Sequence, residues 1–230
     1  MSSAYQPEYV PTIHEIHEAF ADEMTSVGGV VSNVFDDDVR LFARAVLPAE
    51  AEVRAGDAVN AGVAIRATGT EIVVSPYTFR RVCTNGAIAA HVTQSRRLER
   101  VECSEVLRPA YDAAATLLDV RGAVRACAAG DVFGDLVDEM RTAADRHTEA
   151  MVMLLSAMRG ISDEHLPEIL DRFTRARDRT AFGLMNAVTS YARDTQDPER
   201  RWNLEELGGG FLARLAAAPP RVPEAALARA

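Results

Sequence analysis

The sequence predicts an α+β fold, with a leading helix, a meander of antiparallel β-hairpins and a C-terminal helical region. Apolar residues between positions 30 and 82 recur at the two-residue period of strands, with turn-forming residues between the runs. Positions 11–25, and most of the chain beyond 104, follow the helical period instead. Because the strands precede the helices rather than alternating with them, an alternating parallel fold is not expected.

The first predicted element is a helix over residues 11–25. Its apolar residues fall on one helical face, at Ile13, Ile16, Ala19 and Phe20. Gly28 and Gly29 end this helix.

Two hairpins follow. Runs 30–34 and 39–46 form the first, with Asp36, Asp37 and Asp38 at its turn, and runs 58–67 and 71–82 form the second around Thr68, Gly69 and Thr70. Residues 48–57 are expected to connect them, with room for a short strand around Val53. A short helix over 86–93 and an edge strand over 96–102 complete this part.

The helical region begins at Ser104, a plausible N-cap. We expect helices over 104–129, 130–158, 162–177, 181–194 and 198–217, the last interrupted by Gly208 to Gly210. The predicted division is an acidic helix at 1–26, a β region at 27–103, a helical region at 104–217 and a flexible tail at 218–230.

The charge is acidic but uneven. All 25 basic residues are arginine, a bias for which a GC-rich genome is favoured over selection for phosphate binding. The net charge of -9 argues against a generic, histone-like DNA binder. Positions 1–39 hold eight acids and no arginine, however, so the rest of the chain is close to neutral and leaves room for a local basic groove.

The composition also predicts a cytoplasmic protein with no membrane segment. No window approaches the ~18 apolar residues that span a bilayer, and residues 1–8 have neither a basic region nor an apolar core. Cys83, Cys103 and Cys127 form no CxxC pattern and are expected to be reduced thiols. No cofactor is expected.

Three patterns in the sequence are candidates for catalytic or metal chemistry. His14, His17 and Glu18 share a helical face, but their spacing is not that of HExxH, and a solvated surface is favoured over a metal site. The three aspartates 36–38 alternate in an extended chain and are better explained by a turn. Cys83 with His91 is a weak nucleophile and base pair, so a packed thiol is favoured. We expect no catalytic site.

The segment 77–86 is the candidate nucleic-acid site. Positions 80–108 contain six arginines and three acids, beside the rings of Tyr77 and Phe79. Guanidinium groups that hold phosphates and rings that stack bases are the components of a single-stranded DNA platform. The residues predicted to contact DNA here are Tyr77, Arg80, Arg81, Asn85, Arg96, Arg97 and Arg100. The competing interpretation, slightly favoured, places the rings in the core and pairs the arginines with Glu99, Glu102 and Glu105.

A second basic cluster lies at 171–179. Arg172, Arg175 and Arg179 follow at helical spacings and are predicted to form one basic stripe. A solvated helix face is the usual meaning of such a stripe. It joins the DNA site only where the fold brings it near Arg80 or Arg96.

Several strings resemble a known family. Residues 56–65 and 77–86, the latter ending in Arg-Val-Cys-Thr-Asn-Gly, resemble the phage/plasmid-like proteins of domain of unknown function 932, as do 180–192 and 202–209. The resemblance covers about positions 27–215 and departs from the family at Arg66 to Gly69, where the family has a longer hairpin. Because the members lie on mobile elements, the resemblance implies DNA metabolism or host–phage conflict.

The leading hypothesis is a non-enzymatic protein of phage or plasmid DNA metabolism that binds single-stranded DNA. The resemblance suggests a homo-oligomer similar in outline to single-strand annealing and recombination proteins. One alternative is a protein-interaction module in host–phage conflict that uses the acidic first segment and binds no nucleic acid. The least favoured alternative is a metal-dependent nuclease that uses His14 and His17.

Overall fold

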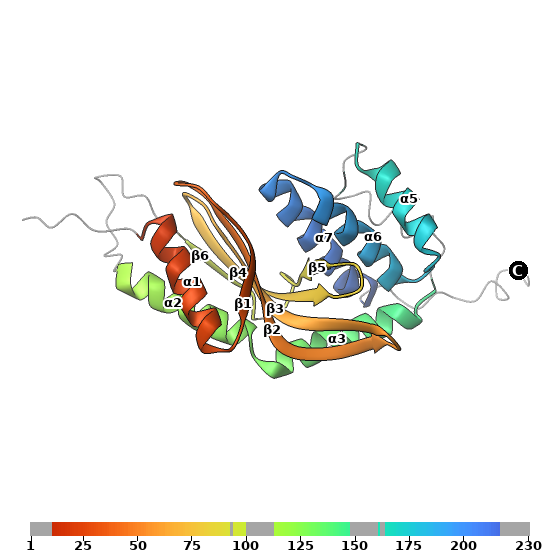
Figure 1. Cartoon of the computed structure of the whole chain (residues 1–230), viewed down its shortest axis with the longest axis horizontal. Coiled ribbons are helices and arrows are strands. Elements are labelled where there is room, and N and C mark those ends of the chain that lie inside the picture. The colour runs from red at the N-terminus through yellow and green to blue at the C-terminus, as the bar shows by residue number, and fades with distance from the viewer. Residues whose placement is uncertain (1–10, 93, 100–112, 148–160, 162–163, 217–230) are drawn as a thin grey trace, which may run out of the picture.

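The fold is α+β, as the sequence predicts, with a leading helix, a curled antiparallel sheet and C-terminal helices (Figure 1). The computed structural model describes residues 11–92, 94–99, 113–147, 161 and 164–216. The helices are α1 (Ile13–Ser26), α2 (Ala113–Cys127), α3 (Gly130–Asp145), α5 (Leu166–Ala176), α6 (Ala181–Asp194) and α7 (Pro198–Ala216). The strands are β1 (Val30–Asp36), β2 (Leu41–Arg54), β3 (Asp57–Ala67), β4 (Glu71–Arg80), β5 (Asn85–Ile88) and β6 (Arg96–Glu99).

The sheet follows chain order from β1 to β5, all antiparallel. Strand β4 carries two partners on one edge, since β5 pairs with its end at residues 77–80 and β6 pairs with its start at residues 71–74. This divides the sheet into two parts. The part with β6 contacts α1 and α2, and the part with β5 contacts α6 and α7.

The expected hairpin turn at the aspartates is present. The Asp37 carboxylate accepts hydrogen bonds from the backbone N–H groups of Val39 at 3.0 Å and Arg40 at 2.6 Å, so the aspartate triplet forms the hairpin turn as predicted. Thr12 and Glu15 cap α1 reciprocally. The helix 181–194 has the predicted bounds.

Four predicted elements were wrong in detail. Residues 85–88 form β5 where a helix over 86–93 was expected. The expected connection at 48–57 is mostly strand, because β2 continues to Arg54 through an irregularity between Val46 and Glu50. Helix α7 passes through Gly208 to Gly210 without a break. Helix α3 ends at Asp145 rather than 158. The expected start at Ser104, the start at Ser162 and the tail at 218–230 lie outside the described residues.

Helices α1 and α2 cover one face of the sheet (Figure 1). Their apolar faces bury Ile16, Phe20 and Val124 against Ile65 and Ile72 of the strands. The alternation of β3 and β4 explains this, because every second side chain of a strand points to the same face.

The opposite face carries a buried polar cluster beneath α7. Arg44 of β2 is 2% exposed, and its Nε donates to Glu205 of α7 at 2.5 Å. Glu205 is 1% exposed and also accepts from Arg201 at 2.9 Å. Trp202 completes the cluster, with the guanidinium carbons of Arg44 and Arg66 at 5.8 and 5.7 Å from its ring centre. A buried charge is tolerable only when it is paired, so with Arg44 in the sheet, Glu205 is needed to neutralise it beneath α7.

Close packing also fixes α7. A Cβ at position 209 would overlap the backbone carbonyl oxygen of Ile88 in β5, and one at 208 would lie 2.6 Å from a methyl carbon of Thr189 in α6. Only glycine lets α7 approach both neighbours this closely. The Gly-Gly-Gly run in a helix is therefore a packing feature of the junction between α6, α7 and β5.

We predict that Glu205→Gln destabilises the protein by about 3–5 kcal/mol, because it leaves the buried Arg44 charge without a neutralising partner. The control Glu168→Gln, which removes an exposed i,i+4 pair with Arg172, is expected to cost less than about 1 kcal/mol. Urea unfolding followed by circular dichroism measures both. Equal losses in the two variants would contradict the assigned role of Glu205, and Arg44→Met with Glu205→Leu is expected to recover most of the loss.

A pair of helix glycines gives a second prediction. Gly209→Ala is expected to destabilise by about 1–3 kcal/mol through overpacking against β5. Gly122→Ala in α2, where nothing lies within 4 Å of the added carbon, is expected to stabilise by about 0.5–1 kcal/mol through helix propensity. Thermal unfolding of the two variants measures the contrast, and a gain in stability from Gly209→Ala would overturn the packing argument.

Candidate functional site

Segment 77–86 runs from the end of β4 through a turn into β5, the strand that contacts α6 and α7. Arg80 donates from Nε and Nη2 to the two carboxylate oxygens of Asp57, each at 2.6 Å, and from Nη1 to Cys83 Sγ at 3.0 Å. Its guanidinium carbon lies 5.6 Å from the ring centre of Phe182 in α6. Burial, the largest single effect, works against this charge, but hydrogen bonding to Asp57 and the attraction of Asp57 and Asp178 together outweigh it and raise the pKa of Arg80. Arg81 pairs with Glu50 at the surface, at 2.7 Å.

Tyr77 and Asn85 lie in the interior. The Tyr77 ring fills the space that a side chain at Gly86 would occupy, and Asn85 Nδ2 donates to the Thr189 hydroxyl of α6. Burial, with the Glu205 carboxylate nearby, raises the pKa of the Tyr77 hydroxyl. Tyr77 is 3% exposed, so its ring has no surface on which a base can stack.

The arginines of β6 lie at the opposite end of β4 from Arg80. Arg97 pairs with Glu71 at 3.0 Å, and Arg96 donates to the Ser95 carbonyl at 3.2 Å. Arg100 lies outside the described residues. Since Arg80 lies at the other end of β4 and pairs with Asp57, the structure does not gather these arginines into one group.

The predicted stripe on α5 is interrupted. Arg172 pairs with Glu168 at 3.1 Å and Asp194 at 2.7 Å, and Arg175 pairs with Asp171 at 2.6 Å. Arg179 was expected on the same helix face, but α5 ends at Ala176. The chain then turns at Arg177, whose φ of 56° is left-handed, and carries Arg179 away from the stripe.

Three arginines differ from these ion-paired ones. Among the described residues, Arg177, Arg179 and Arg200 form no ion pair with a carboxylate. Arg177 and Arg179 line one pocket and Arg200 lines another. These three guanidinium groups therefore border recesses in the described part of the surface.

The first recess, called the Arg177 pocket below, has a volume of about 540 Å³. It is lined by Arg54, His147, Ala176, Arg177, Asp178, Arg179 and Thr180. Three arginines and a histidine thus surround one carboxylate.

Local sequence builds this pocket. The left-handed turn at Arg177 ends α5, and Thr180 caps the start of α6 by accepting from Gly183 N at 3.1 Å. Asp178 accepts from Arg54 at 2.9 Å, which neutralises that arginine. Arg179 lies over the ring of Phe173, with its guanidinium carbon 5.5 Å from the ring centre. The positive charges of Arg177 and Arg179 have no carboxylate partner among the described residues.

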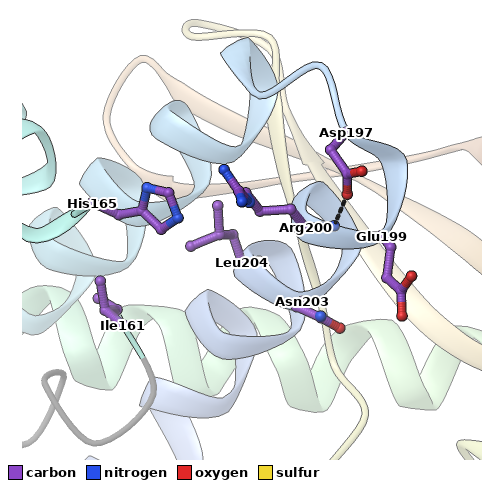
Figure 2. A pocket seen from close by; sticks show the side chains of 7 residues that line it. All are labelled: Ile161, His165, Asp197, Glu199, Arg200, Asn203 and Leu204. Atoms are coloured by element: carbon purple, nitrogen blue, oxygen red, sulfur yellow. Dashed lines mark hydrogen bonds between the residues drawn. The ribbon is translucent and has the colours of Figure 1, made fainter. Parts of the chain in front are cut away.

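The second recess, called the His165 pocket below, has a volume of about 320 Å³ and lies between the start of α5 and the first turns of α7. It is lined by Ile161, His165, Asp197, Glu199, Arg200, Asn203 and Leu204 (Figure 2). The sequence patterns gave no sign of it, because its polar residues are spread over two helices separated by α6.

Each of the other candidate histidines contacts a single carboxylate. His17 Nδ1 lies 2.8 Å from Asp36, and His14 Nε2 lies 3.4 Å from Glu18. His91 contacts Glu139 at 3.2 Å. No set of three or more histidine, cysteine, aspartate or glutamate groups is arranged to hold a metal within the described residues. Burial raises the pKa of the Cys127 thiol to about 12, as befits a packed thiol.

Comparisons with protein-family models, curated proteins and solved structures found no match. Membership of the domain of unknown function 932 family therefore stays a prediction. Within the described residues, no helix is both long enough and apolar enough to cross a membrane.

Proposed function

We propose that the protein binds single-stranded DNA without catalysis, and that the Arg177 pocket holds its phosphates. The observation that carries this proposal is the pair Arg177 and Arg179, which line an open recess and lack a carboxylate partner within the described residues. Neutralisation of phosphates by such guanidinium groups is the main source of affinity for nucleic acid.

The pairing of the other arginines supports the choice of this pocket. A phosphate that approaches Arg80, Arg97 or Arg172 must displace a carboxylate already in contact. A phosphate that approaches Arg177 or Arg179 displaces no carboxylate of the described residues. The planar guanidinium also suits bidentate contact with a phosphate, which an ammonium group cannot provide.

The lining predicts the mode of binding. His147 is the only residue of the seven with a ring, so the pocket is suited to the backbone rather than to stacked bases. Contacts to phosphates alone carry no sequence information. We therefore propose binding with little sequence preference, in the cytoplasm, in the phage or plasmid DNA metabolism that the resemblance implies.

The test is a fluorescence-anisotropy titration with a labelled oligo-dT at low salt. Arg177→Gln with Arg179→Gln is expected to weaken binding at least about tenfold and to reduce the salt slope by about 1.4, since each phosphate contact to a single strand contributes about 0.7. The matched control removes two ion-paired surface charges, through Arg141→Gln with Arg175→Gln, and is expected to change affinity less than about threefold.

Two outcomes contradict the proposal. Absence of binding by the wild-type protein at about 10 μM and low salt excludes the function, because non-specific affinities reach this range. Equal weakening by the pocket variant and the control assigns binding to general charge rather than to the Arg177 pocket. Circular dichroism of each variant checks that it is folded.

We also propose that two copies associate through β1. This strand is an edge of the sheet, and among the described strands it pairs only with β2. Val30 and Val34 are exposed, and residues 30–35 carry no charge that would repel an identical strand in antiparallel pairing. Unprotected edges of this kind favour pairing with another chain.

Sedimentation velocity tests this association. Val34→Lys is expected to shift an oligomer of the wild-type protein toward monomer, because an edge lysine opposes strand addition. Val82→Lys, at an exposed valine in the turn before β5, is expected to leave the oligomer intact. A wild-type protein that remains monomeric at about 100 μM would exclude the proposal, because a dissociation constant above this concentration is weaker than that of most stable assemblies.

A further inference from the structure

The His165 pocket contains a buried imidazole with one ring nitrogen available. His165 is 7% exposed, and its Nδ1 lies 2.8 Å from the Tyr191 hydroxyl oxygen. The two rings lie against each other, with centres 5.4 Å apart, which fixes the orientation of the imidazole. Nε2 has no hydrogen-bond partner within the described residues. A buried, oriented histidine with one free nitrogen is suited to contact a ligand.

Arg200 supplies a second group for such a ligand. Its backbone N–H donates to the Asp197 carboxylate at 2.7 Å, which makes Asp197 a cap of α7. Its guanidinium forms no ion pair with any described carboxylate. In Figure 2 the Arg200 side chain extends toward His165, whereas the Glu199 carboxylate lies on the far side of Arg200 from His165.

The remaining walls are apolar on the side of His165. Ile161 and Leu204 are 6% and 5% exposed and border the same recess. A volume of about 320 Å³ is near the lower end of the range for small-molecule sites, about 300–1,000 Å³. An apolar wall with a few converging polar groups is the usual composition of such sites.

We propose that the His165 pocket binds a small organic anion. Its carboxylate or phosphate group is held by the Arg200 guanidinium and by His165 Nε2, and its apolar part lies against Ile161 and Leu204. The Glu199 carboxylate at the rim of the pocket repels the anion and so limits the affinity of the pocket for it. This site is separate from the Arg177 pocket, and the proposal does not depend on DNA binding.

The imidazole signals of the protein test the proposal, since the chain has only five histidines. The probes are phenyl phosphate, benzoate and inorganic phosphate, each titrated to about 10 mM and followed by proton–carbon NMR. Signals are assigned with His165→Gln and His147→Gln. We expect phenyl phosphate or benzoate to move the His165 signal with saturation near a Kd of about 1 mM, a weak affinity suited to a small fragment.

Substitutions at Arg200 and Glu199 are expected to change the affinity for the anion in opposite directions. Arg200→Gln is expected to weaken binding at least about fivefold, and Glu199→Gln to tighten it about two- to threefold, through loss of one attractive and one repulsive charge. The control Arg175→Gln is expected to leave the Kd unchanged. Saturation by benzoate alone identifies the ligand class as carboxylates, and saturation by phenyl phosphate alone identifies it as phosphate esters.

The same spectra separate this proposal from the DNA-binding one. His147 lines the Arg177 pocket and His165 lines the other, so an oligo-dT titration that moves only the His147 signal supports DNA binding and leaves the His165 pocket to small anions. The proposal would be overturned by a His165 signal that does not move with either organic probe. It would also be overturned by a signal that moves as much with inorganic phosphate as with the organic probes, and as much in Arg200→Gln as in the wild-type protein.

Discussion

The attachment of the helical layer to the sheet depends on one carboxylate. Glu205 lies between Arg44 of β2 and Arg201 of its own helix, and both Glu205 and Arg44 are buried. Removing water from these two charged groups is unfavourable, and their mutual contact offsets it. Because the pair joins residues 161 positions apart, it also fixes which part of α7 faces the sheet. The position of both pockets relative to the sheet follows from this contact, through the packing of α6 on α7 and of α5 on α6.

The sequence predicts the parts of this fold that follow local rules. Strand periodicity locates both hairpins, and the aspartate triplet locates a turn that the Asp37 hydrogen bonds confirm. The period of α6 gives its bounds correctly. The errors arise where tertiary contacts override local preference. Residues 85–88 become a strand because β4 offers an unpaired edge, and α7 keeps Gly208 and Gly209 because they allow close contact with α6 and β5.

The candidate sites were harder to predict than the fold. Guanidinium groups close together in sequence suggested a DNA surface, but the structure pairs Arg80, Arg81 and Arg97 with the carboxylates of Asp57, Glu50 and Glu71 in other strands. Whether an arginine is free depends on these partners, which local spacing does not reveal. Arg179 was selected for a helical stripe, and it lines a pocket for a different reason, the left-handed turn at Arg177. Nothing local distinguished Arg200.

Two aromatic rings each contact two arginine side chains, in a way that lysine could not reproduce. Phe182 lies under both Arg54 and Arg80, as Trp202 lies under Arg44 and Arg66. A planar guanidinium can lie over a ring and still donate in its own plane to a carboxylate, whereas an ammonium group is a compact point charge. Whatever genomic bias first favoured arginine codons, these positions now depend on the shape of the cation. Exchange of arginine for lysine at these four sites would keep every charge and still lose the contacts that hold two layers of the protein together.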